Sequence, residues 1–235
     1  MKNGLFSLLF LLFALPTFGS SDTLAVSIFN KCQKAHANLK NNKIVINSQF
    51  FQKNGDSFSS SGEAIISKSA TYVKMLGIEN ITLLDKGIMV QVQESENLLT
   101  IYALPENSTA SAKVELNNPD VFKAIRGLTT NVQLQYKLVA ENSSYYTIHI
   151  FTLQQWTYDL IALKVLKSSY LLSEITFLIA SQNNSDVNRA ITKYTYSDLG
   201  TLPEKLKLDY YIERKNKKWS PSKRFAKFKL NDFTS

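Results

Sequence analysis

The stretch TLLDKGIMVQVQESENLLTIYALPE, residues 82–106, consists of short apolar strands separated by tight turns. The first turn is Asp85–Gly87 and the second is Glu94–Asn97. Gly, Asn and acidic residues between apolar runs are typical of β-hairpins, and strands joined by such short turns pair antiparallel. The stretch contains no recognisable reactive group, so it predicts the wall of a sheet and not a catalytic centre.

The same two-residue period runs through most of the chain. It begins at Ile44 and reverses at Asn54–Asp56, where Asn-Gly is a strong hairpin signal. We predict strands over residues 44–51, 58–68, 71–78, 81–84, 88–93, 98–104, 132–139, 145–153, 159–166, 170–180 and 190–197.

Two segments have helical spacing instead. Asp22 is a plausible N-cap for an amphipathic helix over 22–39, and a second, short helix is predicted over 121–128, after Pro119. About ten consecutive strands with two helices predict a mainly β (α+β) fold. The expected form is one large, strongly curved sheet, or a barrel with helices inside it or over its mouth. The apolar stripe of the first helix is Leu24, Ile28, Cys32, Ala35 and Leu39.

The first 19 residues have the features of a secretory signal peptide. Lys2 supplies the positive start, Leu5–Leu15 is the apolar region, and Thr17–Gly19 offers small residues for cleavage after Gly19. We therefore expect export, with residues 20–235 forming a single domain. Cys32 is the only cysteine, so no internal disulfide is possible, which favours a bacterial periplasm. Cys32 itself is expected to be a buried small residue on the helix.

The chain has a net charge of +8, and much of the excess lies in a basic C-terminal extension that begins at about residue 204. A basic patch attracts phosphate, either of nucleic acid or of lipid headgroups. Export argues against nucleic acid. The extension is therefore either a solvated tail or a contact with an anionic surface.

The sequence shows no constellation that would carry catalysis. His36 is expected on the surface of the first helix and His149 in a strand, and neither has partners at metal-ligand or triad spacing. No G-x-S-x-G motif and no glycine-rich phosphate loop occur. We predict that the protein is not an enzyme and needs no cofactor or metal. A hydrolase acting on lipid is a third alternative, to be tested at His149.

Several strands carry an apolar stripe on one face. Examples are 88–92, 134–138 and 175–179, where apolar residues alternate with others. Such a face either packs against helices as an ordinary core or curls to form an apolar pocket. The pattern alone leaves both alternatives open.

The order of motifs resembles that of the periplasmic outer-membrane lipoprotein carriers, the LolA-like family. The resemblance covers about residues 22–200: a helix, then an aromatic-x-Gln strand end, a Ser-Gly strand start, an Asp-containing hairpin, and a Tyr-rich last hairpin. The segments that carry it are Phe50–Gln52, Ser61–Glu63, Thr71–Met75, Leu83–Gly87, Glu94–Tyr102, Leu134–Leu138 and Thr192–Leu199.

The resemblance implies an incompletely closed antiparallel β-barrel whose short helices form a lid. Its apolar interior would carry lipoprotein acyl chains, or a related lipid, across the periplasm toward the outer membrane. An inner-membrane ABC-type (ATP-driven) release complex and an outer-membrane acceptor would be partners of a monomeric carrier. Leu24 and Ile28 would lie on the lid, and Lys74 stands where the family has a lid-tethering Arg. The predicted lipid-binding wall is Phe50, Ile66, Tyr72, Ile88, Val90, Val92, Leu134, Tyr136, Ile175, Phe177 and Ile179.

The alternative function is that of a non-enzymatic envelope interaction protein. It would have the same sheet with a filled core, and it would dock on a membrane or a partner through its basic C-terminus. Such a contact weakens steeply with ionic strength, whereas burial of an acyl chain does not.

Overall fold

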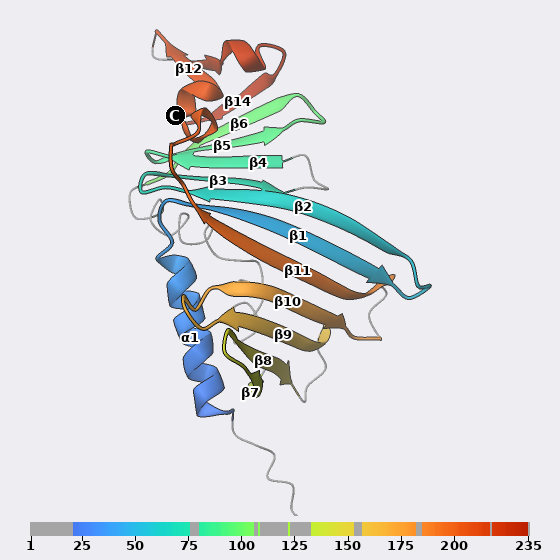
Figure 1. Ribbon diagram of the computed structural model, residues 1–235. Coiled ribbons are helices and arrows are strands. Elements are labelled where there is room, and N and C mark those ends of the chain that lie inside the picture. Colours follow the sequence, from blue (N-terminus) through green and yellow to red (C-terminus); the bar gives the residue numbers. More distant parts are fainter. Residues whose placement is uncertain are drawn as a thin grey trace, which may run out of the picture.

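A twelve-stranded, strongly curved sheet forms the body of the protein, with one long helix against it (Figure 1). The computed structural model describes residues 21–75, 80–105, 108, 122, 133–152, 157–181, 185–216 and 218–234. The predicted signal peptide and nearly all of the predicted helix 121–128 lie outside these residues. In the described part, no helix has the length and apolar character needed to cross a membrane.

The helix α1 and the strands β1–β11 follow the predicted order, whereas the strands after residue 204 were not predicted. The helix α1 is Thr23–Ala37. The strands of the main sheet are β1 (Asn42–Gln52), β2 (Ser57–Ile66), β3 (Ala70–Met75), β4 (Asn80–Asp85), β5 (Ile88–Gln93), β6 (Leu98–Ala103), β7 (Leu134–Glu141), β8 (Tyr145–Thr152), β9 (Tyr158–Leu166), β10 (Leu172–Ile179), β11 (Val187–Asp198) and β14 (Lys229–Phe233).

The sheet is open, with the order β14-β6-β5-β4-β3-β2-β1-β11-β10-β9-β8-β7. Its two edge strands, β14 and β7, lie at opposite ends of this order. The predicted fold, a curved and incompletely closed β structure with a helix over one face, is confirmed. One pairing differs from the expectation, because β14 runs parallel to β6, whereas every other neighbouring pair in the sheet is antiparallel.

The turn residues of the opening stretch have the backbone that a tight hairpin requires. Lys86 and Gly87 both have positive φ, at 50° and 77°. Two consecutive residues with positive φ are the signature of the type I′ turn, whose twist matches that of paired strands. This turn puts Leu83 opposite Val90 and so fixes which side chains of β4 and β5 share a face.

The two faces of the sheet are covered by opposite ends of the chain. Residues directly opposite on neighbouring strands point to the same side. Tracing these pairs from β3 to β1 places Tyr72 on the same side as Lys43, while tracing them from β10 to β1 places Ile175 on the same side as Ser48. Lys43 and Ser48 are an odd number of residues apart, so Tyr72 and Ile175 lie on opposite faces. We name these the cap face and the helix face.

The helix α1 packs on the helix face, over β7 to β10. Its N-cap is Asp22, whose Oδ1 accepts from the backbone N–H of Leu24 at 2.8 Å. The N–H of Asp22 in turn donates to the carbonyl of Tyr136 in β7 at 2.9 Å, which ties the start of the helix to the edge strand. The buried residues of this core are Ala25, Ile28, Phe29, Cys32, Phe122, Ile148, Ile150, Ile161, Leu163, Val165, Leu172 and Ile175.

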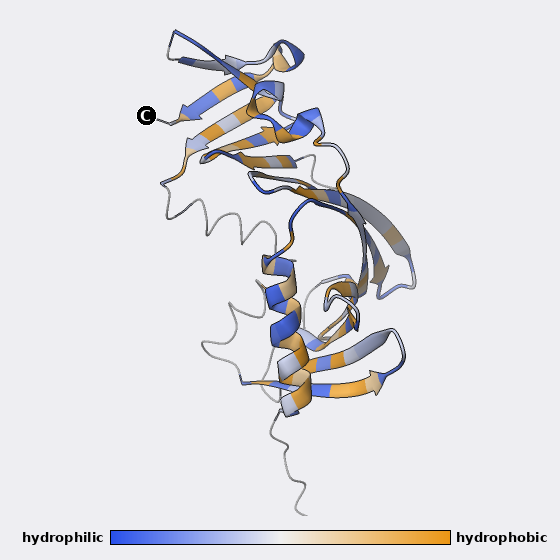
Figure 2. Ribbon diagram, turned by 60° about the vertical axis from the view of Figure 1, so that its left-hand side comes forward, coloured by the Kyte–Doolittle hydropathy of each residue, from blue (hydrophilic) through white to orange (hydrophobic). Residues whose placement is uncertain are grey.

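The C-terminal residues 204–234, which we name the cap, pack on the cap face over β2 to β6. The cap contains η1 (Glu204–Leu206), η2 (Leu208–Tyr210), β12 (Ile212–Lys215), β13 (Lys218–Pro221), η3 (Lys223–Phe225) and β14. The core beneath it contains Leu206, Tyr211, Ile212 and Phe225 from the cap, with Ile65, Ala70, Tyr72, Ile81, Leu83, Val90, Val92, Leu99 and Ile101 from the sheet. The solvated-tail alternative is therefore wrong, because these cap side chains have apolar partners on the sheet. Figure 2 shows hydrophobic segments, in orange, in the strands β3–β6 and in the cap.

His36 is a second correction. It was expected on the helix surface, but it is fully buried near the end of α1. Its Nε2 accepts from the backbone N–H of Leu172 at 3.1 Å and lies 3.4 Å from the hydroxyl of Tyr196. A donor from β10 makes burial of the imidazole possible, and desolvation lowers the pKa of His36 from 6.5 to about 3. Cys32 is buried on α1, as predicted.

Candidate functional site

The predicted wall residues do not surround one cavity, because the register places them on both faces of the sheet. Four of them lie on the cap face, where the cap covers them: Tyr72, Ile88, Val90 and Val92. These four pack in the core beneath the cap, so they lie on the opposite face from the other predicted wall residues. The others lie on the helix face: Phe50, Ile66, Leu134, Tyr136, Ile175, Phe177 and Ile179.

On the helix face, a continuous line of apolar side chains crosses seven neighbouring strands. Each member lies directly opposite the next in the strand register, so all of them point to the same side. Strands are about 4.8 Å apart, which makes the line about 29 Å long. We name it the apolar row; in order from β2 to β7, it is Phe58, Phe50, Ala190, Phe177, Ile161, Ile150 and Tyr136.

The two ends of the apolar row differ in exposure. Ile161 and Ile150 are fully buried beneath α1, and Tyr136 contacts Phe29 of the helix at a ring distance of 5.0 Å. At the other end, Phe58 stacks on Phe50 at 4.8 Å and still exposes 48% of its surface. The row therefore begins at the solvent on the β1–β2 hairpin and ends under the helix.

Half-buried aromatic residues occupy the middle of the row. Phe177 is partly exposed and lies 5.1 Å from the ring of Tyr158. Phe50 is likewise only partly buried. Partly exposed aromatic surface on a concave, helix-covered face is the kind of surface on which proteins bind apolar ligands.

The helix presents one side to this face. Ile28 and Phe29 are buried against the sheet. Leu24, which the sequence placed in the same stripe, exposes 51% of its surface. The helix is rotated relative to the predicted stripe because the bulkier Phe29 occupies the contact with Tyr136 and Phe122.

Lys74 does not tether the helix in this structure. It lies on the cap face, opposite to α1, and its Nζ is 3.3 Å from Oε2 of Glu94 in the β5–β6 turn. The side chain of Lys74 follows the same alternation as Tyr72, so the strand register alone excludes a contact with the other face.

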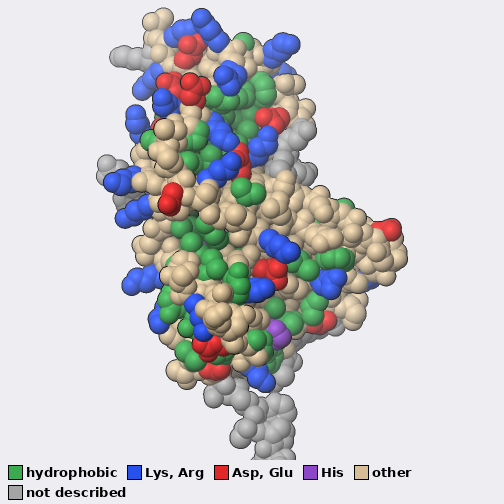
Figure 3. All heavy atoms as spheres, viewed as in Figure 1, with side chains coloured by type: hydrophobic (Ala, Val, Ile, Leu, Met, Phe, Trp, Pro, Cys, Tyr) green, Lys and Arg blue, Asp and Glu red, His purple; other side chains and the backbone are tan. Residues whose placement is uncertain are grey.

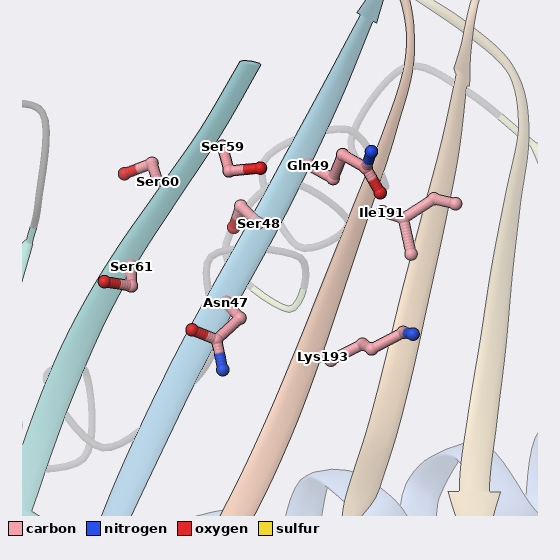
Figure 4. A pocket seen from close by; sticks show the side chains of 8 residues that line it. All are labelled: Asn47, Ser48, Gln49, Ser59, Ser60, Ser61, Ile191 and Lys193. Carbon is pink, nitrogen blue, oxygen red and sulfur yellow. The ribbon is translucent and has the colours of Figure 1, made fainter. Parts of the chain in front are cut away.

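A hollow of about 430 Å³ lies on the cap face, beyond the cap (Figure 4). Seven of its eight lining residues have polar side chains and the eighth is Ile191, but apolar atoms make up the larger part of the lining surface. The lining therefore offers hydroxyl, amide and ammonium groups for hydrogen bonds beside apolar surface. The lining residues are Asn47, Ser48, Gln49, Ser59, Ser60, Ser61, Ile191 and Lys193.

The titratable groups show no catalytic arrangement among the described residues. His149 lies on the cap face, where burial and the neighbouring Lys137 lower its pKa. Burial raises the pKa of Glu63, but Lys205 and Lys43 outweigh it and the net shift is downward. Within the described ranges, no group of His, Cys, Asp or Glu side chains is placed to hold a metal ion.

Sequence reasoning found Phe50, Phe177 and Tyr136 of the apolar row and missed Phe58, Ala190, Ile161 and Ile150. A signal for Phe58 was present in the sequence. The Asn54–Gly55 turn places Phe58 opposite Phe50 in the hairpin. No local signal predicts that Ala190 lies opposite Phe50, because β1 and β11 are separated by more than 130 residues of chain.

No protein-family model matches this sequence, and comparison with curated proteins finds no similar sequence. Several solved structures are similar to it. A LolA superfamily protein from Nitrosomonas europaea is 15% identical with a TM-score of 0.34, over 79% of this chain and 98% of that one. A putative outer membrane lipoprotein-sorting protein domain from Vibrio parahaemolyticus is 8% identical with a TM-score of 0.32, over 77% and 95%.

Pseudomonas aeruginosa MucB, solved in complex with MucA, is 12% identical with a TM-score of 0.44. The match covers 78% of this chain and 60% of that one, so this chain spans about three fifths of it. The likeness to all three structures is one of fold, and at such identities few side chains coincide.

Proposed function

We propose that the protein is a periplasmic carrier that binds a lipid acyl chain, such as that of a lipoprotein, along the apolar row. The observation that supports this function is the row itself, because it offers continuous apolar contact from an exposed end at Phe58 to a buried end under α1. A bilayer's hydrocarbon core is about 30 Å thick, so one acyl chain spans about 15 Å of it. The row, at about 29 Å, is longer than that. It is therefore long enough for one acyl chain.

Binding along the row is driven by removal of methylene groups from water. Each buried methylene contributes about 0.8 kcal/mol, so even the exposed part of the row provides affinity for a chain of ordinary length. To reach the buried end, the chain would displace α1 from Tyr136 and Ile150. In this proposal α1 is the lid, and release of the cargo follows its return to the sheet. An inner-membrane release complex and an outer-membrane acceptor would supply and remove the cargo, with no cofactor on the carrier.

The test is binding of a soluble fluorescent fatty-acyl probe to the purified protein and to single-residue variants. We expect Phe58→Asp and Phe177→Asp to weaken binding by roughly tenfold or more, the effect of removing one large apolar contact of about 1.5–3 kcal/mol. Phe233→Asp is the matched control, because Phe233 is also an exposed stacked aromatic, at 59% exposure, but lies in β14.

Native mass spectrometry of protein purified from its own cell envelope complements the probe. A bound lipid or acylated protein, lost in the Phe58→Asp variant, supports the carrier. Equal binding by all three variants, or an unliganded mass with no probe uptake, would reject it. The second of these outcomes favours the envelope interaction protein with a filled core.

A further inference from the structure

The cap carries most of the net charge of the protein on a small, well-anchored unit. Residues 204–235 contain ten Lys and Arg against four Asp and Glu, so they account for six of the net +8 charges of the chain. Figure 3 shows many Lys and Arg side chains over the cap end of the molecule. Concentrated charge of one sign creates a potential that attracts a surface of the opposite sign.

The cap is a folded unit held by internal hydrogen bonds and by packing on the sheet. The hydroxyl of Ser222 donates to the carbonyl of Tyr210 at 2.8 Å, and the hydroxyl of Tyr211 donates to the carbonyl of Lys205 at 3.1 Å. Tyr211 and Phe225 are buried with their rings 5.3 Å apart. The charges on the cap are therefore presented at fixed positions relative to the sheet.

Several cationic side chains in the described part of the cap are unpaired. Lys205 pairs with Glu63, Lys215 pairs with Glu213, and Arg224 donates to the Tyr210 hydroxyl. Among the described residues, five exposed lysines of the cap have no carboxylate within ion-pair distance: Lys207, Lys218, Lys223, Lys227 and Lys229. An unpaired charge keeps its full attraction for an external anionic group.

Exposed apolar and aromatic groups lie in the cap and beside it. Leu202, two residues before the cap, exposes 57% of its surface, and Phe233 exposes 59% but stacks on Tyr102 on the helix-face side of β14. Trp219 is partly exposed, with the Arg214 guanidinium 5.2 Å from its ring. Aromatic rings beside lysines are characteristic of the interfacial region of a membrane, where the ring enters the headgroup layer and the ammonium groups meet lipid phosphates.

We propose that the cap is a docking surface for an anionic lipid bilayer. The proposal goes beyond acyl-chain binding and is independent of it, because the cap and the apolar row lie on opposite faces of the sheet. The unpaired lysines Lys207, Lys218, Lys223 and Lys227 supply the charge attraction, and Trp219 supplies shallow insertion. Phe233 and Lys229 do not take part, because they lie opposite Tyr102 and Leu98 of β6 and therefore point to the helix face. The docked protein would then stand with the cap on the membrane and with the apolar row directed away from the cap core.

The experiment is flotation of the full mature chain with vesicles, either of phosphatidylcholine alone or with about one third phosphatidylglycerol, at rising NaCl concentrations. We expect binding only to the anionic vesicles, falling steeply with salt because the contact is screened. The variant Lys218→Gln/Lys223→Gln/Lys227→Gln is expected to bind roughly 100-fold more weakly, as each lysine near an anionic surface contributes about a factor of five.

The matched control is Lys34→Gln/Lys40→Gln/Lys137→Gln, which removes the same charge from exposed lysines outside the cap. We expect it to lower binding by less than about threefold. Equal losses in both triple variants would show attraction by net charge alone and overturn the proposal, as would equal binding to neutral vesicles or no binding at low salt.

The two proposals fail separately. Phe58→Asp is expected to lose the acyl probe and keep vesicle binding, whereas the cap variant is expected to do the opposite. Added inorganic phosphate at millimolar concentration distinguishes a bilayer from a small phosphate site, because a bilayer contact should persist in it.

Discussion

Each half of the sheet is covered on one face by the chain terminus that is more distant from it in the sequence. The N-terminal helix α1 covers β7–β10, which come late in the chain, and the C-terminal cap covers β2–β6, which come early. Between the two lies the β1–β11 pair, whose register runs from Asn42↔Asp198 to Gln52↔Val187. Neither half of the sheet has its apolar face covered by its own neighbours in sequence.

The two coverings also differ in chemistry. The helix core continues into the apolar row and is open to solvent at Phe58, whereas the cap core buries the sheet residues beneath it and the lysines of the cap lie on the outside. An apolar surface that is open to solvent can bind and release a ligand. A buried core beneath a charged surface can present that surface for docking. The difference predicts that damage to the helix core affects ligand binding, and that damage to the cap core affects docking.

The largest expected effect comes from removing the aromatic contact of the helix. Phe29→Ala deletes a buried ring that touches Phe122 at 5.7 Å and Tyr136 at 5.0 Å, which should cost about 3–5 kcal/mol in the free energy of unfolding. Urea denaturation measures it. Leu24→Ala on the same helix is the control, with an expected change within about 0.5 kcal/mol because Leu24 is exposed. Similar losses in both variants would mean that α1 is not packed as described.

The corresponding change in the cap core is expected to be somewhat smaller. Phe225→Ala removes a ring that is 8% exposed and packs on Tyr211 and Phe228, at a cost of about 3 kcal/mol. Hydrogen exchange should show faster exchange in β5 and β6 with little change in β8 and β9. Phe233→Ala is the control in the same unit. Uniform acceleration across the sheet would instead show that the two halves unfold together.

The strands up to residue 198 could be predicted well, because turns such as Asp85–Gly87 and Asn54–Asp56 determine local pairing. The strands β12–β14 of the cap were not predicted. The sequence also did not predict which face each strand would bury. Val90 and Phe177 both sit in apolar stripes, and only the long-range β1–β11 and β10–β11 registers place them on opposite faces. The burial of His36 depended on the N–H of Leu172, 136 residues away, and could not be read from helical spacing.

His36 makes the helix core sensitive to acid. Its folded pKa of about 3 lies below the ordinary 6.5, so between these values the unfolded chain binds more protons and stability falls as the pH falls. The maximal slope is about 1.4 kcal/mol per pH unit. From pH 6 to pH 4, wild type should therefore lose about 2 kcal/mol more than His36→Gln, which retains an acceptor for Leu172. Parallel pH profiles in urea denaturation would contradict this role.

The smallest effect is expected at Glu63 of β2, where the cap meets the sheet. Its carboxylate pairs with Lys205 of the cap and lies 3.5 Å from Lys43 of β1, and the side chain is 23% exposed. Burial raises the pKa of Glu63, but the two lysines outweigh burial, so the folded pKa is lowered. A carboxyl group with a lowered pKa in the folded protein stabilises the fold at pH values above its pKa in the unfolded chain. This contribution is lost as the pH falls through the folded pKa.

Glu63→Gln should therefore cost less than about 1 kcal/mol at pH 7, since the pair is partly solvated, and nothing at a pH where Glu63 is protonated. Glu213→Gln is the control, because its partner Lys215 is 70% exposed and the pair lies within the cap. Urea midpoints at pH 7 and at low pH measure both variants. Because Glu63 joins the cap to the sheet and Glu213 does not, only Glu63→Gln should also speed proteolysis of the cap at neutral pH. A loss that persists in acid would assign the effect to packing of the side chain and not to its charge.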